Sequence, residues 1–283
     1  MCLITSNEDL INSLKKAKDN KMQTVGFVPT MGYLHDGHLS LIKKAKEEND
    51  IVVVSVFVNP TQFGPNEDFD RYPRDIERDY KIAKEAGADI VYNPEVEDIY
   101  PKGASTFAVV DGDITKKLCG ASRPNHFKGV TTVVNILFNI VMPDRAYFGQ
   151  KDAQQVIVIK KMVRDLHMKV DIVVCPIVRE ADGLAMSSRN VYLNQDERKQ
   201  ALVLNLALAE AQKKCKQGNT KVTDLKAFIK ETIEAQPLAQ IDYVEILDAQ
   251  TLDEIKEIKK QALAAVAVKF GKTRLIDNVF IDS

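Results

Sequence analysis

The sequence has few of the features that mark secreted or nucleic-acid-binding proteins. Only four of the 283 residues are cysteines, and they lie far apart, at positions 2, 119, 175 and 215. Because neither a paired spacing nor a metal-type spacing is present, we expect reduced thiols. The formal net charge is -1, from 39 basic and 40 acidic residues. Such a balance supplies no long-range field to gather DNA or tRNA, so any phosphate binding must be local.

Long apolar runs are also missing. The most apolar short run, Ile51 to Val58, is far below the roughly 20 residues that a membrane span requires. The N-terminus meets charged residues by Glu8 and lacks the apolar core of a signal peptide. We therefore expect a cytoplasmic protein with neither a membrane partner nor a nucleic-acid partner. The composition, 45% hydrophobic and 28% charged, predicts a well-formed core.

Short β-branched segments alternate with amphipathic segments over the first two thirds of the chain. The former predict strands that are buried on both faces, and the latter predict helices. The expected strands are 24–29, 51–59, 88–94, 145–149 and 171–178, and the expected helices are 39–48, 72–87, 130–141 and 152–166. This alternation predicts a Rossmann-like, doubly wound parallel sheet with helices on both faces.

The pattern changes after residue 178. An amphipathic helix over 195–218 and a second over 223–235, capped by Thr223, are followed by strands at 241–249, 262–270 and 273–281. We therefore expect an α/β domain over residues 1–178 and a smaller C-terminal α+β domain over residues 179–283.

Four segments are richer in polar residues and glycine than packing requires: 29–38, 57–74, 148–155 and 179–190. Three of them directly follow a predicted strand and precede a predicted helix. Open α/β sheets bind ligands at the carboxyl ends of their strands, so these segments are the candidate site.

The segment 29–38, PTMGYLHDGH, contains two of the four histidines. His35 and His38 fall at the start of a predicted helix, where backbone N–H groups and the helix dipole favour an anion. Gly32 and Gly37 permit close approach of the backbone. A metal site is an alternative, although no further ligands are spaced to complete it. A polar turn with two solvated histidines is the other alternative.

Two later segments carry cationic and hydroxyl groups. The segment 179–190 contains Ser187, Ser188 and Arg189 in an open, mobile-looking loop, and these groups match a pyrophosphate. Lys151 in the segment 148–155 is a point charge suited to phosphate, while Asp152 is a candidate helix cap. Each segment taken alone is equally consistent with an exposed polar loop.

Taken together, the segments resemble a known family. An HxGH loop after the first strand and a later serine-rich cationic loop are similar to the HIGH and KMSKS signatures of nucleotidyltransferases and class I aminoacyl-tRNA synthetases. PTMGYLHDGHLSL, VFVNPTQF, RYPR, LCGASRPNHFKGV, FGQKDAQQ and READGLAMSSRNVYL resemble, in order, the motifs of the pantothenate synthetases, or pantoate:beta-alanine ligases. The resemblance spans residues 25 to 193.

The resemblance implies a set of site residues. The catalytic residues would be His38, His35, Lys151 and Arg189. ATP would be bound by Met31, Gly32, Tyr33, Leu34, His35, Asp36, Gly37, His38, Gly149, Gln150, Lys151, Asp152, Val178, Met186, Ser187, Ser188 and Arg189. Gln62 and Gln155 would hold pantoate, and Gln62 would also contact beta-alanine. Further candidates are Asp70, Arg71, Arg74, Arg123 and His126. For the acidic run EDFDRYPRD, which contains the first three, a solvated, helix-capping surface is at least as good an interpretation. Gln150 and Ala153 depart from the family's usual glutamate and aromatic residue.

The implied reaction has two steps: pantoate attacks the α-phosphorus of ATP, and the amine of beta-alanine then attacks the resulting adenylate, giving pantothenate and AMP. ATP would be a substrate accompanied by Mg²⁺, with no tightly bound cofactor and no protein-bound metal. The resemblance also implies a homodimer, and a 179–190 loop or C-terminal domain that closes over the adenylate. Alternatives are another HIGH-type adenylyltransferase acting on a different small acid or phosphate ester, a tRNA synthetase fragment, and a nucleotide-binding regulatory module.

Overall fold

The structure, a computed structural model, describes residues 1–20, 23–65, 67, 69–101 and 106–282. The chain forms two compact units. The first unit comprises Met1–Asp111, Arg123–Gly149 and Val158–Pro176, and the second comprises Gly112–Ser122, Gln150–Ile157 and Ile177–Ser283. The predicted division into residues 1–178 and 179–283 is simpler than these two units, because the segments Gly112–Ser122 and Gln150–Ile157 belong with the C-terminal part. A boundary between separately folding domains at that point stays a prediction.

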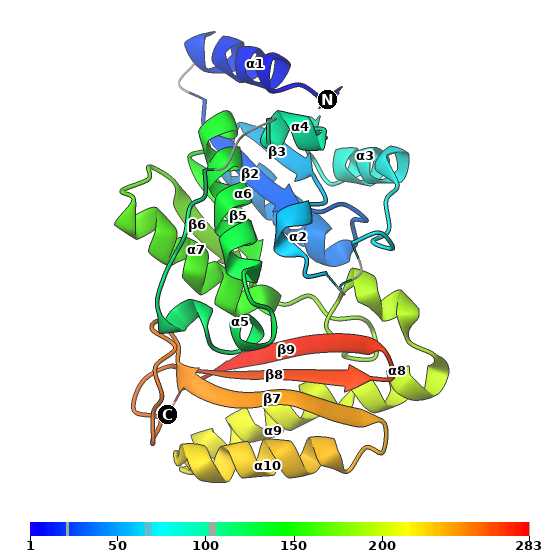
Figure 1. The fold of residues 1–283 in the computed structure, drawn as a ribbon, viewed down its shortest axis with the longest axis vertical. Helices are drawn as coiled ribbons and strands as arrows, with labels where there is room; N and C mark the ends of the chain where they lie inside the picture. The colour runs from blue at the N-terminus through cyan, green and yellow to red at the C-terminus, as the bar shows by residue number, and fades with distance from the viewer. Residues whose placement is uncertain (21–22, 66, 68, 102–105, 283) are drawn as a thin grey trace. The chain divides into compact units, whose positions relative to one another are not determined.

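The first unit is built on a six-stranded parallel sheet with the order β1-β4-β3-β2-β5-β6 (Figure 1). The strands are β1 (Cys2–Ile4), β2 (Val25–Thr30), β3 (Ile51–Val56), β4 (Ile90–Tyr92), β5 (Arg145–Gly149) and β6 (Asp171–Cys175). The chain runs outward from β2 to β3 and β4, and then returns to β5 on the other side of β2. This reversal between β2 and β5 is the topological switch point at which such sheets bind ligands.

Helices cover both faces of this sheet. They are α1 (Asn7–Asn20), α2 (Asp36–Glu48), α3 (Ile76–Glu85), α4 (Val96–Ile99) and α6 (His126–Val141), while α7 (Ala153–Asp165) begins in the second unit and ends in the first. Adjacent side chains of β2 lie on opposite faces of the sheet. Val28 packs with Ile42 of α2 on one face, and the centre of the Phe27 ring lies 6.3 Å from that of Phe138 in α6 on the other. The predicted doubly wound fold is confirmed.

Several details of the first unit differ from the prediction. The strand β1 and the helices α1 and α4 were not predicted: β1 and α4 have only three and four residues, and α1 is strongly polar although its few apolar residues keep the helical spacing. The strand β6 is not buried on both faces: Asp171 is exposed and Ile172 to Val174 are only partly buried. β6 is the last strand of the sheet and pairs with β5, so its outer edge has no neighbouring strand among the described residues.

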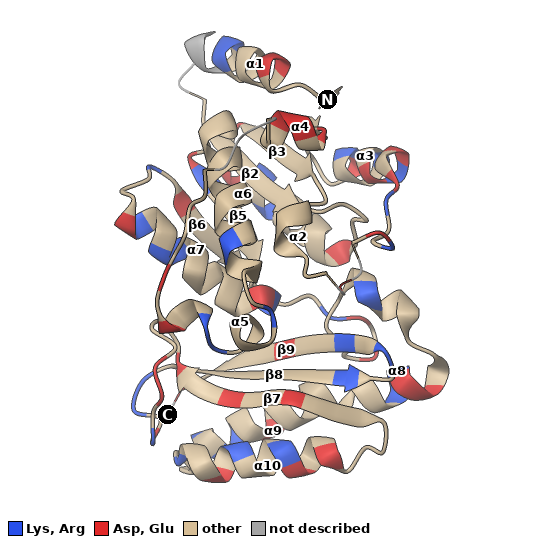
Figure 2. Cartoon of the chain, viewed as in Figure 1, with Lys and Arg blue, Asp and Glu red and all other residues tan. Residues whose placement is uncertain are grey.

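The second unit contains an antiparallel sheet of β7 (Ala239–Asp248), β8 (Ala262–Phe270) and β9 (Thr273–Ile281), as predicted. Its helices are α5 (Cys119–Ser122), α8 (Gln195–Ala201), α9 (Val203–Lys216) and α10 (Val222–Glu234). Leu204, Leu208, Leu225 and Ile229 of α9 and α10 are buried in one core with residues of β7, β8 and β9. Charged residues of both signs lie along α10 (Figure 2).

Two helix predictions in this unit were wrong. The single helix expected over 195–218 is interrupted at Leu202, which separates α8 from α9. The second helix starts at Val222 after Lys221, and Thr223 lies inside it rather than capping it. Within the part of the chain that the structure describes, no helix combines the length and apolarity needed to cross a membrane.

Candidate active site

The predicted loops follow four strands that are neighbours in the sheet. Residues 57–74 follow β3, residues 31–38 follow β2, residues 150–155 follow β5, and residues 176–190 follow β6. The strands are parallel, so all four loops begin at the same edge of the sheet, on either side of the switch point. Within the first unit lie Met31 to His38, Gln62, Gly149 and the further candidates; the other residues assigned to ATP and pantoate belong to the second unit.

The two histidines at the start of α2 contact each other directly. His35 is the residue before the first helical turn, and its backbone N–H donates to His38 Nδ1 at 3.3 Å. The two rings stack with centroids 4.0 Å apart and an interplanar angle of 29°. Because His38 Nδ1 accepts a hydrogen bond, its neutral imidazole carries the proton on Nε2. Nε2 is therefore the donor of this ring, as binding to a phosphate oxygen would require.

The loop before these histidines is held by Asp79, which the sequence prediction missed. Asp79 is fully buried in α3, and its carboxylate accepts hydrogen bonds from the backbone N–H groups of Tyr33 (2.6 Å) and Leu34 (2.8 Å). Gly32 has φ of +83°, and a Cβ there would lie 2.8 Å from Val56 and 2.9 Å from Asp79. The loop conformation therefore requires glycine and is set by a carboxylate 45 residues further along the chain.

A sequence signal for Asp79 exists. Within the helix pattern, Ile76, Ala83 and Ala86 form an apolar stripe, and Asp79 occupies the position between them at the same helical spacing. A carboxylate in such a stripe needs partners. Burial raises the pKa of Asp79, and the hydrogen bonds from the two backbone groups offset this only in part.

Gln62 is presented by a short 3-10 helix, η1 (Pro60–Gln62), after β3. Its Nε2 donates to Met31 Sδ at 3.1 Å, which brings the predicted pantoate residue and the predicted nucleotide loop together. Its Oε1 accepts from Asn59 Nδ2 at 3.0 Å. Asn59 is 1% exposed, and its Oδ1 accepts from Tyr100 Oη at 2.8 Å, so the orientation of the Asn59 amide is fixed. Because Asn59 binds the Oε1 end of the Gln62 amide, the Nε2 end of that amide points away from Asn59.

The backbone of η1 lies directly on α6. A Cβ at Gly129 would be only 2.4 Å from the Thr61 carbonyl oxygen, so this contact requires glycine. The packing places the carbonyl group of Gln62 against the first turn of α6.

Two of the further candidates, Arg123 and His126, hold the same Gln62 carbonyl. His126 Nδ1 lies 2.9 Å from Gln62 O and must be the donor, because a carbonyl only accepts. His126 Nε2 then accepts from Arg123 Nη1 at 3.1 Å. Glu67 binds the Arg123 fork through both carboxylate oxygens, one of them 2.6 Å from Nε. Burial raises the pKa of Glu67, but the hydrogen bonds and charge of Arg123 outweigh it, so the pKa lies below its ordinary value.

The remaining candidates in this segment have more ordinary roles. Arg74 donates to the backbone carbonyls of Tyr72 (3.0 Å) and Phe69 (3.1 Å), which stabilises the loop itself. Asp70 and Arg71 are exposed. Asp75 caps the start of α3, because its carboxylate accepts a hydrogen bond from the backbone N–H of Arg78. This agrees with the helix-capping interpretation of the acidic run.

In the second unit, the residues after β5 form a short 3-10 turn, η3 (Gln150–Asp152), which continues into α7. The side chain of Lys151 is 22% exposed, and its Nζ lies 3.8 Å from Asp152 Oδ2. The neighbouring glutamines differ in environment. Gln154 is buried and hydrogen-bonds to backbone groups of Ile114, Lys117 and Cys119, whereas Gln155 is only partly buried. Gln154 is therefore structural, and Gln155 is the one with accessible surface.

The segment 179–190 is not the open loop that the sequence predicted. Met186 N donates to Val178 O at 3.0 Å, and Arg179 bridges to Ala185 in antiparallel pairing, so the segment forms a tight hairpin turn. Ser187 then caps the 3-10 helix η4 (Ser188–Tyr192) by accepting from Arg189 N at 3.3 Å. The predicted pyrophosphate residues thus lie at the start of a helix that follows a braced turn.

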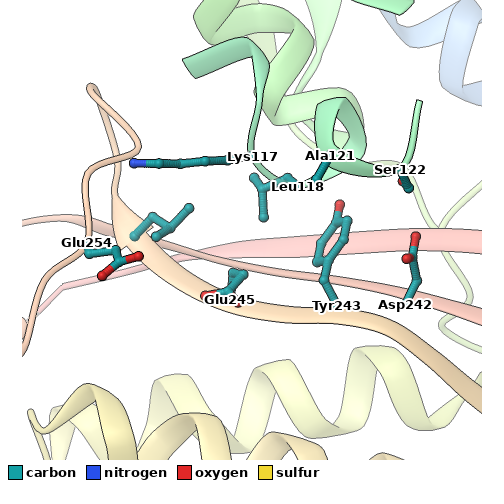
Figure 3. A pocket seen from close by; sticks show the side chains of 9 residues that line it. Lys117, Leu118, Ala121, Ser122, Asp242, Tyr243, Glu245 and Glu254 are labelled. Atoms are coloured by element: carbon teal, nitrogen blue, oxygen red, sulfur yellow. The ribbon is translucent and has the colours of Figure 1, made fainter. Parts of the chain in front are cut away.

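A pocket of about 440 Å³ lies elsewhere in the second unit and contains none of the predicted site residues (Figure 3). Two of its charged side chains already bond within the protein: Lys117 Nζ donates to Leu252 O at 2.8 Å, and Asp242 pairs with Arg274 at 2.7 Å. The acidic positions of β7 that border it are visible in Figure 2. Within the described ranges, no three His, Cys, Asp or Glu side chains cluster as a metal site.

Comparison with known proteins extends the similarity over the whole chain. The sequence model of the pantoate-beta-alanine ligase family matches residues 3–280. The chain is 57% identical to the pantothenate synthetase of Acetivibrio thermocellus over 282 residues, covering 100% of both chains. The fold matches the crystal structure of pantothenate synthetase from Thermus thermophilus with a TM-score of 0.95, 46% identity and 100% coverage of both chains.

A second solved structure was determined with bound ligands. The pantoate-beta-alanine ligase of Francisella tularensis, complexed with beta-gamma ATP and beta-alanine, matches with a TM-score of 0.77 and 36% identity. The match covers 99% of this chain and 97% of the other.

Proposed function

Because this chain belongs to the pantoate-beta-alanine ligase family, we propose that it condenses (R)-pantoate with beta-alanine to form pantothenate, consuming ATP. The chain is an enzyme of the ligase class. In the first step, the pantoate carboxylate attacks the α-phosphorus of ATP and pyrophosphate leaves. In the second, the beta-alanine amine attacks the acyl carbonyl of pantoyl adenylate, loses a proton, and displaces AMP.

The first step brings a carboxylate towards a polyanion, so its main requirement is positive charge and N–H donors around the phosphates. We assign ATP binding to Met31 to His38, Gly149 to Asp152, Val178, and Met186 to Arg189. His38 would donate from Nε2 to an oxygen of the α-phosphate, with Lys151 neutralising charge beside it. Ser187, Ser188 and Arg189 would stabilise the departing pyrophosphate. The histidine pair supports this role, since the His35 backbone holds His38 in the tautomer that donates from Nε2.

The acid substrate needs recognition without a neutralising charge, because its carboxylate is the nucleophile. We assign pantoate to Gln62 and Gln155, and beta-alanine to Gln62. The Gln62 Oε1 atom is occupied by Asn59, so the Nε2 group is the part of this amide that would donate to a substrate oxygen. No side chain acts as a covalent nucleophile in this scheme.

Mg²⁺ would enter with ATP as part of the substrate complex, coordinated by phosphate oxygens. A cytoplasmic location and a homodimeric state remain predictions of the sequence. Light scattering of the purified protein measures the oligomeric state directly, and a mass of one chain would refute the dimer.

The observation that best supports the proposal is the contact between two predicted groups from neighbouring strand ends: Gln62 Nε2 lies 3.1 Å from Met31 Sδ. This contact supports the assignment of the acid substrate and the nucleotide to adjoining residues. The test is turnover of ATP and Mg²⁺ with pantoate and beta-alanine, monitored as AMP and pyrophosphate. We expect pyrophosphate on addition of pantoate alone, and pantothenate and AMP when both acids are present. ATP binding without pantoate-dependent turnover would point instead to another substrate or to a regulatory module.

A further inference from the structure

Strand β9 carries two buried polar side chains next to each other. Asp277 is 2% exposed and Asn278 is 4% exposed, although both lie in a strand that is otherwise mostly apolar. Buried polar groups are costly unless they are hydrogen-bonded, so their partners indicate what they do.

Asn278 bonds to the turn that carries Lys151. Its Nδ2 donates to the carbonyl oxygens of Gln150 (3.1 Å) and Lys151 (2.9 Å). Its Oδ1 accepts from Gln150 Nε2 at 3.3 Å. Both ends of one buried amide are therefore used to hold η3, 127 residues earlier in the chain.

Asp277 holds the other cationic segment. Its carboxylate pairs with both terminal nitrogens of Arg179, at 2.7 and 3.1 Å. Arg179 Nη1 also donates to Gly183 O at 3.2 Å, and Arg179 is the residue that pairs with Ala185 across the hairpin turn. The ion pair thereby braces the base of the turn that leads into Ser187 to Arg189.

One strand can hold both segments because its side chains alternate between the two faces of the sheet. Leu275 and Val279 pack into the core formed with α9 and α10, and Asp277 lies on their side of the strand. Phe280 packs with Leu118 and Ala153 on the opposite side, which is also the side of Asn278. Two consecutive residues thus reach two different loops from a single rigid element.

We infer that Asp277 and Asn278 are positioning residues for the phosphate-binding groups of the second unit. Asn278 sets the turn that presents Lys151, and Asp277 sets the hairpin that presents Ser187 to Arg189. Both loops then take their relative position from one strand, which is what binding of a single triphosphate by two loops requires. The inference rests on the proposed function, because it assumes that these loops bind ATP.

The decisive variant is Asn278→Asp, which keeps the shape of the side chain but replaces its two N–H donors with an oxygen facing two carbonyl groups. We expect kcat/KM for ATP to fall about 100-fold, the loss typical when catalytic groups are displaced by about 1 Å. Thr273→Val is the matched control, an isosteric loss of a buried polar atom on the same strand; it should keep near-normal kinetics. Asn278→Ala replaces the test variant if the aspartate prevents folding.

A double-mutant cycle separates positioning from a general loss of stability. In a Lys151→Ala background, Asn278→Asp should add only a few-fold further loss, because the group that it positions is already missing. If the two losses multiply, or if Asn278→Asp alone has normal kinetics, the inference is wrong. Asp277→Asn paired with Arg189→Ala makes the same test for the other loop. A wild-type protein without pantoate-dependent turnover, or a fully active Lys151→Ala variant, would instead count against the proposed function.

Discussion

The two units hold their assigned phosphate-binding segments in different ways. In the first unit, the loop that carries His35 and His38 connects β2 directly to α2, and a carboxylate from the next helix along, Asp79, fixes its backbone. In the second unit, the turn at Lys151 and the hairpin before Ser187 are held by side chains of the last strand, far away in the sequence.

The difference explains which parts of the site a sequence reveals. A strand-to-loop-to-helix connection generates an anion site by local geometry, because the helix start supplies N–H groups wherever it forms. A loop that is held by a side chain from a distant part of the sequence, as the Lys151 turn is held by Asn278, depends on a contact that only the tertiary structure creates. The following predictions test this contrast, beginning with the largest effect.

The first concerns the chemistry of the first-unit loop. His38→Ala should lower the turnover rate at least about 100-fold, because it removes a donor at the reacting phosphate, while the protein stays folded. Steady-state kinetics and circular dichroism measure the two properties. His167→Ala is the matched control, since His167 is exposed and lies outside the site. Near-normal turnover of the His38 variant would remove this histidine from the mechanism.

The second concerns the brace of that loop. Asp79→Asn should lower the free energy of unfolding by about 2 kcal/mol, because one backbone N–H loses a charged acceptor and faces an amide group instead. The KM for ATP should rise in parallel. Urea denaturation measures the free energy of unfolding, and initial rates at varied ATP concentration measure the KM.

The control for Asp79 lies one turn earlier in the chain. Asp75→Asn should change little, since asparagine caps a helix as well as aspartate does. If Asp79→Asn and Asp75→Asn behave alike, the carboxylate does not set the nucleotide loop.

The third contrasts two adjacent glutamines in the second unit. Gln155→Ala should lower kcat/KM for pantoate roughly tenfold, equivalent to about 1.4 kcal/mol, and leave thermal stability unchanged. Gln154→Ala should do the reverse, costing about 1 to 3 kcal/mol of stability because three partly buried backbone groups lose their partner. Pantoate kinetics and thermal melts distinguish the two. An unchanged KM and kcat for pantoate in the Gln155 variant would refute its assignment.

The smallest expected effect is the pH dependence of the Glu67 brace. Its pKa is lower in the folded protein than its ordinary value of 4.5, so Glu67 stabilises the fold above that pH. The contribution is lost as the pH falls through the lower, folded-state value. Denaturation of wild type and Glu67→Gln between about pH 7 and about pH 3 should show a difference under about 1 kcal/mol that shrinks in acid. A difference that grows in acid would contradict this pairing.

Hydrophobic periodicity was sufficient for most of the fold. The strands β2 to β6 of the first unit and the three strands of the second unit were predicted, because their runs of apolar residues leave a clear pattern. The helices and strands that escaped prediction are short or polar: β1, α1, α4 and α5. The break at Leu202 was missed as well. At Leu202 the apolar pattern continues unchanged, so nothing in the periodicity marks the interruption between α8 and α9.

The site divides in the same way. The histidine pair, Gln62 and Lys151 were predicted as site residues because they follow strand ends and match the family's motifs. Asp79, Asn59 and Asn278 were not, because a buried polar residue has the same appearance in a sequence as an exposed one. For Asp79 alone, its place within an apolar stripe offered a usable signal.

The sequence by itself determined the sheet, the carboxyl edge on which the loops gather, and the family to which the motifs belong. These follow from periodicity and from residues close together in the chain. Only the tertiary structure decided that Asn59 orients Gln62, that Asp79 holds the loop after β2, and that Asp277 and Asn278 hold two loops from opposite sides of β9. Those contacts join residues far apart in sequence, and the cost of leaving a buried polar group unpaired is what selects each partner.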